Sequence, residues 1–187
     1  MAVVCALLLA VACGDAEPTP GPLAPAEPLA GQAGGFRVPE ARIGHPFTFA
    51  EVFVTNSGSK PATLVGIELM EPTEGMSLVG SEVAIRQGHG PYSPGGYERF
   101  PPETDFPTDS LEGFKLPPSD GTSGLQVLIG LMIEPGVQTF RGVAIEYMVD
   151  GVEHRYVFPY AVAACSPGES GGPGGSCRPP GLQPWGS

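Results

Sequence analysis

Three histidines, His45, His89 and His154, are the side chains of this 187-residue chain best suited to bind a transition metal. A zinc or copper site needs ligands that converge, and the sequence has no H-x-x-x-H, H-x-M, C-x-x-C or H-x-x-E-H spacing. His89 lies between two glycines, and His154 falls on the apolar face of a predicted strand, where a single imidazole usually packs. We therefore predict no metal site and no cofactor, and keep His89 and His154 as the candidate ligands if a metal does bind.

Two strings match nucleophile motifs by letter. The segment around Ser170 reads G-x-S-x-G, and Ser57 to Lys60 reads S-x-x-K. The first motif needs a strand that leads into a helix, whereas Ser170 lies in a Gly/Pro-rich tail. The second needs a helix that brings the lysine to the serine, whereas Ser57 and Lys60 fall in a predicted loop. We interpret both as chance matches and predict no catalytic residues and no enzymatic activity.

Acidic side chains gather in one Pro-rich stretch, where Arg99 and Lys115 accompany them. Calcium sites place oxygen ligands at alternate positions around a glycine, and no such repeat occurs here. The acids are therefore predicted to be solvated: Glu98, Glu103, Asp105, Asp109, Glu112 and Asp120. The chain has a net charge of −11 with only nine Lys and Arg, so it has no basic patch for a phosphate backbone, and we predict no nucleic-acid partner.

The elements that would position these side chains are short apolar runs between turns. With 28 Gly and 23 Pro, the chain is rich in turn formers, and no segment has a sustained helical period. Residues 36–164 are predicted to form one domain. We expect the Pro/Ala/Gly-rich residues 13–35 and the low-complexity residues 165–187 to be disordered, and residues 14–35 to bury nothing.

The first predicted strands are a short edge strand at Phe36–Val38 and a central strand at Phe47–Thr55. The latter is apolar on both faces, with Phe47, Phe49 and Phe53 sharing one of them. Turn residues 56–61 then lead to a strand at 62–70, and we expect the pair to form a hairpin. The residues predicted to face inward on this second strand are Val65, Ile67 and Leu69.

Shorter strands are predicted at Met76–Val79 and Glu82–Arg86, and a core strand at Leu125–Ile133. Between them lies a long Pro-rich loop, residues 87–123, which has the length of a functional loop. Its aromatic residues could form an exposed recognition surface, but we favour packing against the domain as a lid; they are Tyr92, Tyr97, Phe100, Phe106 and Phe114.

Asp150-Gly151 between two apolar runs is the strongest hairpin signal in the chain. A two-residue turn there predicts the pairs Val149–Val152, Tyr147–His154, Ile145–Tyr156 and Val143–Phe158 on an apolar face. The other face would pair Met148 with Glu153 and Glu146 with Arg155. One register thus gives both an apolar face and an opposite-charge pair, and a slip of one residue would destroy both.

Together these strands predict an all-β fold, an antiparallel β-sandwich of about seven strands. The stretch V-x-N-x-G-x-x-P-A-T-L, residues 54–64, resembles hairpins of immunoglobulin-like and fibronectin-like domains of bacterial envelope proteins. That resemblance implies an immunoglobulin-like sandwich.

The N-terminal run Leu7 to Cys13 resembles the lipobox of bacterial lipoproteins. The apolar residues 2–12 are too short to cross a bilayer but suit a signal peptide, which we assign to residues 1–12. The resemblance implies that Cys13 is acylated and becomes the mature N-terminus of an extracytoplasmic protein on a Pro-rich stalk. Gly14 after the cysteine favours an outer-membrane or surface location over retention at the inner membrane.

An alternative remains, because Ala10-Val11-Ala12 also fits ordinary signal peptidase, which would release a soluble protein. Loss of Cys5 with the signal leaves three cysteines, an odd number for a secreted protein. Acylation of Cys13 removes the odd one and lets Cys165 pair with Cys177. We therefore favour the lipoprotein.

The expected function is a non-enzymatic binding or structural module, lipid-anchored in the cell membrane or outer membrane, with a protein partner in the envelope. The alternative is an exported copper- or zinc-binding chaperone-like domain. It would use His89, His154 and the sulfur of methionines, which are Met70, Met76, Met132 and Met148.

Overall fold

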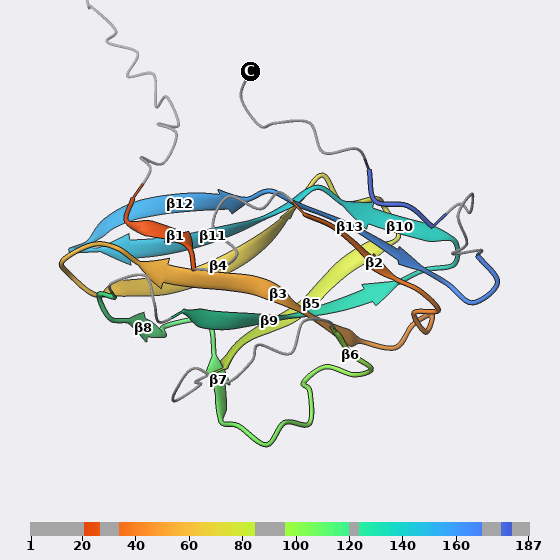
Figure 1. Ribbon diagram of the computed structural model, residues 1–187, viewed down its shortest axis with the longest axis horizontal. Coiled ribbons are helices and arrows are strands. Elements are labelled where there is room, and N and C mark those ends of the chain that lie inside the picture. Colours follow the sequence, from red (N-terminus) through yellow and green to blue (C-terminus); the bar gives the residue numbers. More distant parts are fainter. Residues whose placement is uncertain (1–20, 27–33, 85–95, 120–123, 170–176, 181–187) are drawn as a thin grey trace, which may run out of the picture.

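Strands make up all the regular secondary structure in the computed structural model, which describes residues 21–26, 34–84, 96–119, 124–169 and 177–180 (Figure 1). In these residues the all-β class is confirmed. Their strands are β1 Leu23–Pro25, β2 Gly34–Val38, β3 Phe47–Asn56, β4 Ala62–Met70, β5 Met76–Ala84, β6 Gly96–Tyr97, β7 Thr108–Ser110, β8 Lys115–Leu116, β9 Leu125–Ile133, β10 Val137–Phe140, β11 Gly142–Val149, β12 Val152–Phe158 and β13 Tyr160–Cys165. The number exceeds the prediction because several are short pieces in segments expected to be loops.

The first sheet has the strand order β1-β3-β9-β5-β7, with β6 also paired to β3. All ten residues of β3 are buried, and so is nearly every residue of β9. Strands apolar on both faces belong in the middle of a covered sheet. The predicted central position of β3 and the predicted core strand β9 are therefore confirmed.

The other two sheets have the orders β12-β11-β4-β8 and β10-β13-β2. One long hairpin links them, because β10 continues into β11 after Arg141 and β12 continues into β13 after Pro159. Proline lacks the N–H that a ladder needs, so the pairing breaks there and each half joins a different sheet. Along this hairpin the chain passes from one sheet to the next.

The main apolar core takes side chains from the first sheet and from the other two. The ring of Phe49 on β3 packs edge-on against Phe36 on β2 and Phe140 on β10, with centroids 5.6 and 5.8 Å apart. Leu64 and Ile145 enter the same core from β4 and β11. The sheets are antiparallel throughout except where the predicted edge strand, β2, runs parallel to β13.

The hairpin at Asp150-Gly151 has the predicted register from Val143–Phe158 to Val149–Val152. Both turn residues have positive φ, 52° and 79°, as a type I′ turn requires. The charged face differs from the prediction in one respect. Glu146 and Arg155 lie opposite each other, but the ion pair of Arg155 is with Glu68.

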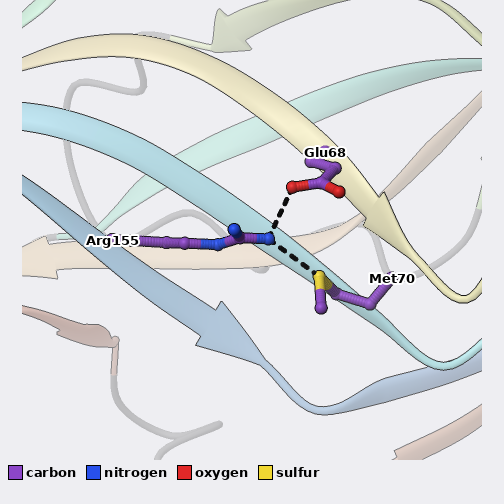
Figure 2. A network of polar contacts seen from close by, with 3 residues as sticks. All are labelled: Glu68, Met70 and Arg155. Atoms are coloured by element: carbon purple, nitrogen blue, oxygen red, sulfur yellow. Dashed lines mark hydrogen bonds and ion pairs between the residues drawn. The ribbon is translucent and has the colours of Figure 1, made fainter. Parts of the chain in front are cut away.

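Figure 2 shows the Arg155 guanidinium reaching from β12 to Glu68 and to the sulfur of Met70, 3.1 Å away, both on β4. The strand β11 lies between β12 and β4. Arg155 therefore ties together three strands, which a pair with Glu146 alone would not do.

The predicted hairpin of residues 47–70 is wrong. In the structure β3 and β4 belong to different sheets, and the connection between them passes from one layer to the other at the end of the core. β3 is buried on both faces and pairs with β9, whereas β4 has one exposed face and pairs with β11. A loop of several residues can join strands of one sheet or of two different sheets. The burial of each strand therefore determines which strand it pairs with.

Three register shifts, each of one extra residue, change which side chains face the core. They fall in β3 after Phe49, in β4 at Val65 and in β5 at Val79. Val65 was predicted to face inward but is 41% exposed, and Leu64 is buried instead. In β3 the core-facing set is Phe47 and Phe49 before the shift and Val52 and Val54 after it. The shift in β5 joins the two strands predicted there into one.

The part of the Pro-rich loop that the structure describes packs as a lid. Phe100 lies over Gly80 and Gly130, where any Cβ would stand less than 3 Å from its ring. Tyr97 and Phe106 pack on a small cluster of Ala50, Ala84 and Leu128, and Phe114 packs against the main core. Packing of these four aromatics is confirmed, and Tyr92 lies outside the described residues.

The expectation that residues 14–35 bury nothing is wrong for residues 21–26. Leu23 is 2% exposed, and its strand β1 pairs with the end of β3. The apolar Leu23 and Ala26 fill the edge between β3 and β12, which a purely compositional argument overlooked. In the described residues no helix is long and apolar enough to cross a membrane.

Candidate functional site

A cleft of about 450 Å³ lies between the β2–β3 connection and β6. Its floor is apolar, with Phe47 and Ala41 almost fully buried beneath it. Charged and aromatic side chains make its walls: Arg37, Glu40, Arg42, Tyr97 and Glu98.

Backbone hydrogen bonds hold the wall formed by the β2–β3 connection. Ala41 N donates to the carbonyl of Cys165 at 2.8 Å, and Gly44 N donates to that of Ile133 at 3.1 Å. Glu40 turns the chain with a φ of 55°. The connection is thus fixed to β13 on one side and to β9 on the other, so Arg42 projects from an anchored backbone. Arg37 belongs to β2, which is held by its pairing with β13.

The opposite wall depends on close approach of β6 to β3. A Cβ at Gly96 would stand 2.6 Å from the carbonyl oxygen of Thr48, so only glycine fits there. Thr48 also donates its hydroxyl to the carbonyl of Arg99 at 2.6 Å. Tyr97 and Glu98 are therefore held between two fixed points.

The charges of the cleft differ from those of the whole chain. Two arginines and two glutamates give the walls no net formal charge, whereas the chain carries −11. None of the described lining residues is a Ser, Cys, Lys or His. This arrangement suits a ligand with a positive group, a negative group and an apolar body, because each finds a complement.

The two described histidines lie near opposite ends of β3. The Nδ1 of His45 is 3.0 Å from the carbonyl oxygen of Ile43, in the β2–β3 connection. His154 stacks on Tyr147, with ring centroids 5.3 Å apart, beside the far end of β3. His89 lies outside the described residues, which hold no group of three His, Cys, Asp or Glu side chains able to bind a metal ion.

A smaller cavity of about 320 Å³ adjoins His154, between Val65, Glu146 and Glu153. Tyr147 beneath it is 1% exposed, and its hydroxyl accepts a hydrogen bond from Leu23 N at 3.3 Å. Burial raises the pKa of the Tyr147 phenol above its usual value of 10.0. Its contact with Leu23 gives Tyr147 a structural role, joining β11 to the N-terminal strand.

The serine and the lysine of the S-x-x-K string have separate partners. Ser57 donates its hydroxyl to the carbonyl of Pro22 at 2.8 Å, while Lys60 forms an ion pair with Asp150. Of the loop acids, Glu103 pairs with Arg99, and Asp109 accepts a hydrogen bond from the N–H of Ser110. Ser170 and Asp120 lie outside the described residues.

Cys165 and Cys177 form a disulfide with a Cα–Cα distance of 5.8 Å, and both are buried. The bond holds the segment 177–180 close to β2, where Pro179 lies beside Gly35. Cys13 lies outside the described residues, so its predicted acylation stays a prediction.

Sequence reasoning named Tyr97 only as a lid aromatic and Glu98 only as a loop acid, and it missed Arg37, Glu40 and Arg42 as wall residues. No motif connects these residues, because the two walls come together only through the pairing of β6 with β3. One signal was available in the sequence. The chain has only nine Lys and Arg, and two of them, Arg37 and Arg42, lie five positions apart. No protein-family model matches the chain, and no curated protein matches it in sequence.

Proposed function

We propose that this chain is a non-enzymatic binding module of a bacterial cell envelope, anchored to a membrane through an acylated Cys13. The single observation that carries the binding role is the cleft, which combines fixed walls, balanced charge and an apolar floor.

The architecture proposed for this module is an immunoglobulin-like sandwich. Support comes from one core between two layers, with β3, β9 and β5 opposite the long hairpin of β10 to β13. In such folds the loops at the ends of the sandwich are the usual binding regions. The β2–β3 connection lies at such an end, and it forms one wall of the cleft (Figure 1).

The ligand class that fits the cleft is a peptide segment with both charges. A direct test uses dipeptides with free ends as probes, alongside the same dipeptides with an acetylated N-terminus or an amidated C-terminus. NMR should show shifts confined to Arg42, Tyr97 and their neighbours, and blocking either end should weaken binding severalfold. Equal shifts at Val152, far from the cleft, or no shift with any probe would contradict the proposal.

The anchor is tested separately in cells. A clickable palmitate analogue should label the wild-type protein in the membrane fraction, and Cys13→Ser should abolish the label and release the protein. Cys5→Ser is the matched control and should leave both unchanged. A wild-type protein that is unlabelled and soluble would rule out lipid anchoring.

A further inference from the structure

The N-terminal segment 21–26 is a fixed part of the domain. Leu23 pairs with Asn56 at the end of β3 and is 2% exposed. The carbonyl oxygen of Pro22 accepts two hydrogen bonds from Ser57, one from its N–H at 3.0 Å and one from its hydroxyl at 2.8 Å. A Cβ at Gly21 would collide with Tyr147 and His154. The chain between Cys13 and the domain therefore ends at Gly21.

This docking sets a limit on the length of the tether. Seven residues, and therefore eight Cα–Cα steps, separate Cys13 from Gly21, so even a fully extended chain spans at most about 29 Å. A tether that ran to Phe36 would reach roughly 80 Å. Docking of β1 thus shortens the longest possible tether to less than half of that length.

Strand β3 separates the point of attachment from the cleft. Asn56 at its end pairs with Leu23, whereas Phe47 at its start lies in the floor of the cleft. Its ten residues span about 30 Å at 3.3 Å per residue. Figure 1 shows the same separation along the long axis, with β1 and the β11–β12 turn towards the left and the β2–β3 connection at the right.

We infer that the docked strand β1 orients the anchored domain, with the β11–β12 turn towards the membrane and the cleft facing away from it. This inference rests on the proposed acylation of Cys13. Its consequence is that the cleft binds a partner in the aqueous compartment and not the lipid headgroups of its own membrane.

Energy transfer measures this orientation on the full acylated protein in vesicles whose lipid headgroups carry an acceptor. The donor is attached to Val152→Cys beside the turn or to Ile43→Cys beside the cleft, at side chains that are 55% and 45% exposed. Because β3 separates the two ends by about 30 Å, we expect roughly two-fold or more higher transfer from position 152. Equal transfer, or higher transfer from position 43, would overturn the inference.

Two variants test the cause of the orientation. Leu23→Ser removes the buried anchor of β1, and a flexible Gly/Ser insertion after Asp15 lengthens the tether without touching the domain. Both should bring the two transfer values together, and a difference that survives the insertion would contradict the role of the short tether. Palmitate labelling of every variant separates the two proposals, because a protein that is labelled but unoriented refutes only this inference.

Discussion

Two connections lie side by side at the same end of the molecule, but one keeps its two strands in one sheet and the other does not. The Asp150-Gly151 turn joins β11 and β12 within one sheet, whereas residues 57–61 carry the chain from one layer to the other. An ion pair between Lys60 and Asp150 links the two. The difference shows that a two-residue turn dictates which strand is the next partner, whereas a longer loop leaves that choice to burial.

The connection of residues 57–61, called the crossing below, depends on Asn56, whose side chain is fully buried. Its amide nitrogen donates to the carbonyls of Lys60 and Leu116, at 2.8 and 3.1 Å, and its amide oxygen accepts from Gly58 N. Leu116 is in β8, which pairs with β4. One side chain therefore shapes the loop and joins the two layers.

The largest expected effect concerns the strand that follows the crossing. Leu64→Ala should lower the free energy of unfolding by about 2–5 kcal/mol, because it opens a cavity in the core. Val65→Ala, at the neighbouring exposed position, should change it by about 0.5 kcal/mol or less. Urea denaturation of both variants tests the extra residue at Val65, since simple alternation predicts the reverse order.

The next effect falls on the crossing itself. Asn56→Ala should cost about 2–3 kcal/mol of unfolding free energy, because buried groups on both layers lose their partners. Ser57→Ala, at an exposed position in the same loop, is the control and should cost less than half as much. Equal losses at the two positions in urea denaturation would show that Asn56 has no special role in the crossing.

A smaller effect is expected in the two-residue turn. Gly151→Ala should cost about 1–2 kcal/mol, because its φ of 79° is unfavourable for a residue with a Cβ. Gly66→Ala on β4 is the control, since its Cβ would meet no atom within 4 Å. A turn that tolerated alanine as well as position 66 would refute the claim that turn geometry sets the register.

The smallest effect on stability at neutral pH comes from three tyrosines of β11, β12 and β13. Burial raises the pKa values of Tyr147, Tyr156 and Tyr160, and the negative charge of Glu51 adds to the effect at Tyr160. A raised pKa in the folded state favours the protonated phenol, so its stabilising contribution is complete below pH 10 and is lost as the pH rises further. Urea denaturation from pH 8 to 11 should therefore show falling stability above pH 10.

The variants Tyr147→Phe, Tyr156→Phe and Tyr160→Phe should each flatten part of that fall. Tyr147→Phe also removes the hydrogen bond with Leu23 and should lower stability at neutral pH by about 1 kcal/mol. A pH profile that no substitution changes would contradict this assignment.

Sequence patterns predicted what short-range geometry controls. The hairpin register followed from Asp150-Gly151. The packing of Phe100 and its neighbours followed from their size and apolar character. The extra residues in three strands were not predicted, because apolar residues at both odd and even positions hid the change of phase that each bulge causes, as at Leu64 and Val65 in β4. The cleft was equally hidden, since Arg42 and Glu98 line it together only after β6 has paired with β3, from which it is distant in the sequence.

The parallel pair of β2 and β13 has a consequence for the order of assembly. Gly34 pairs with Tyr160, and almost the whole domain lies between them in the chain. During synthesis β2 has no partner until β13 has been made, so the sheet β10-β13-β2 cannot form before then. Folding then waits for pairing between distant segments, which is intrinsically slow. A product that stopped before residue 160 would expose the edge of β2 to pairing with other chains.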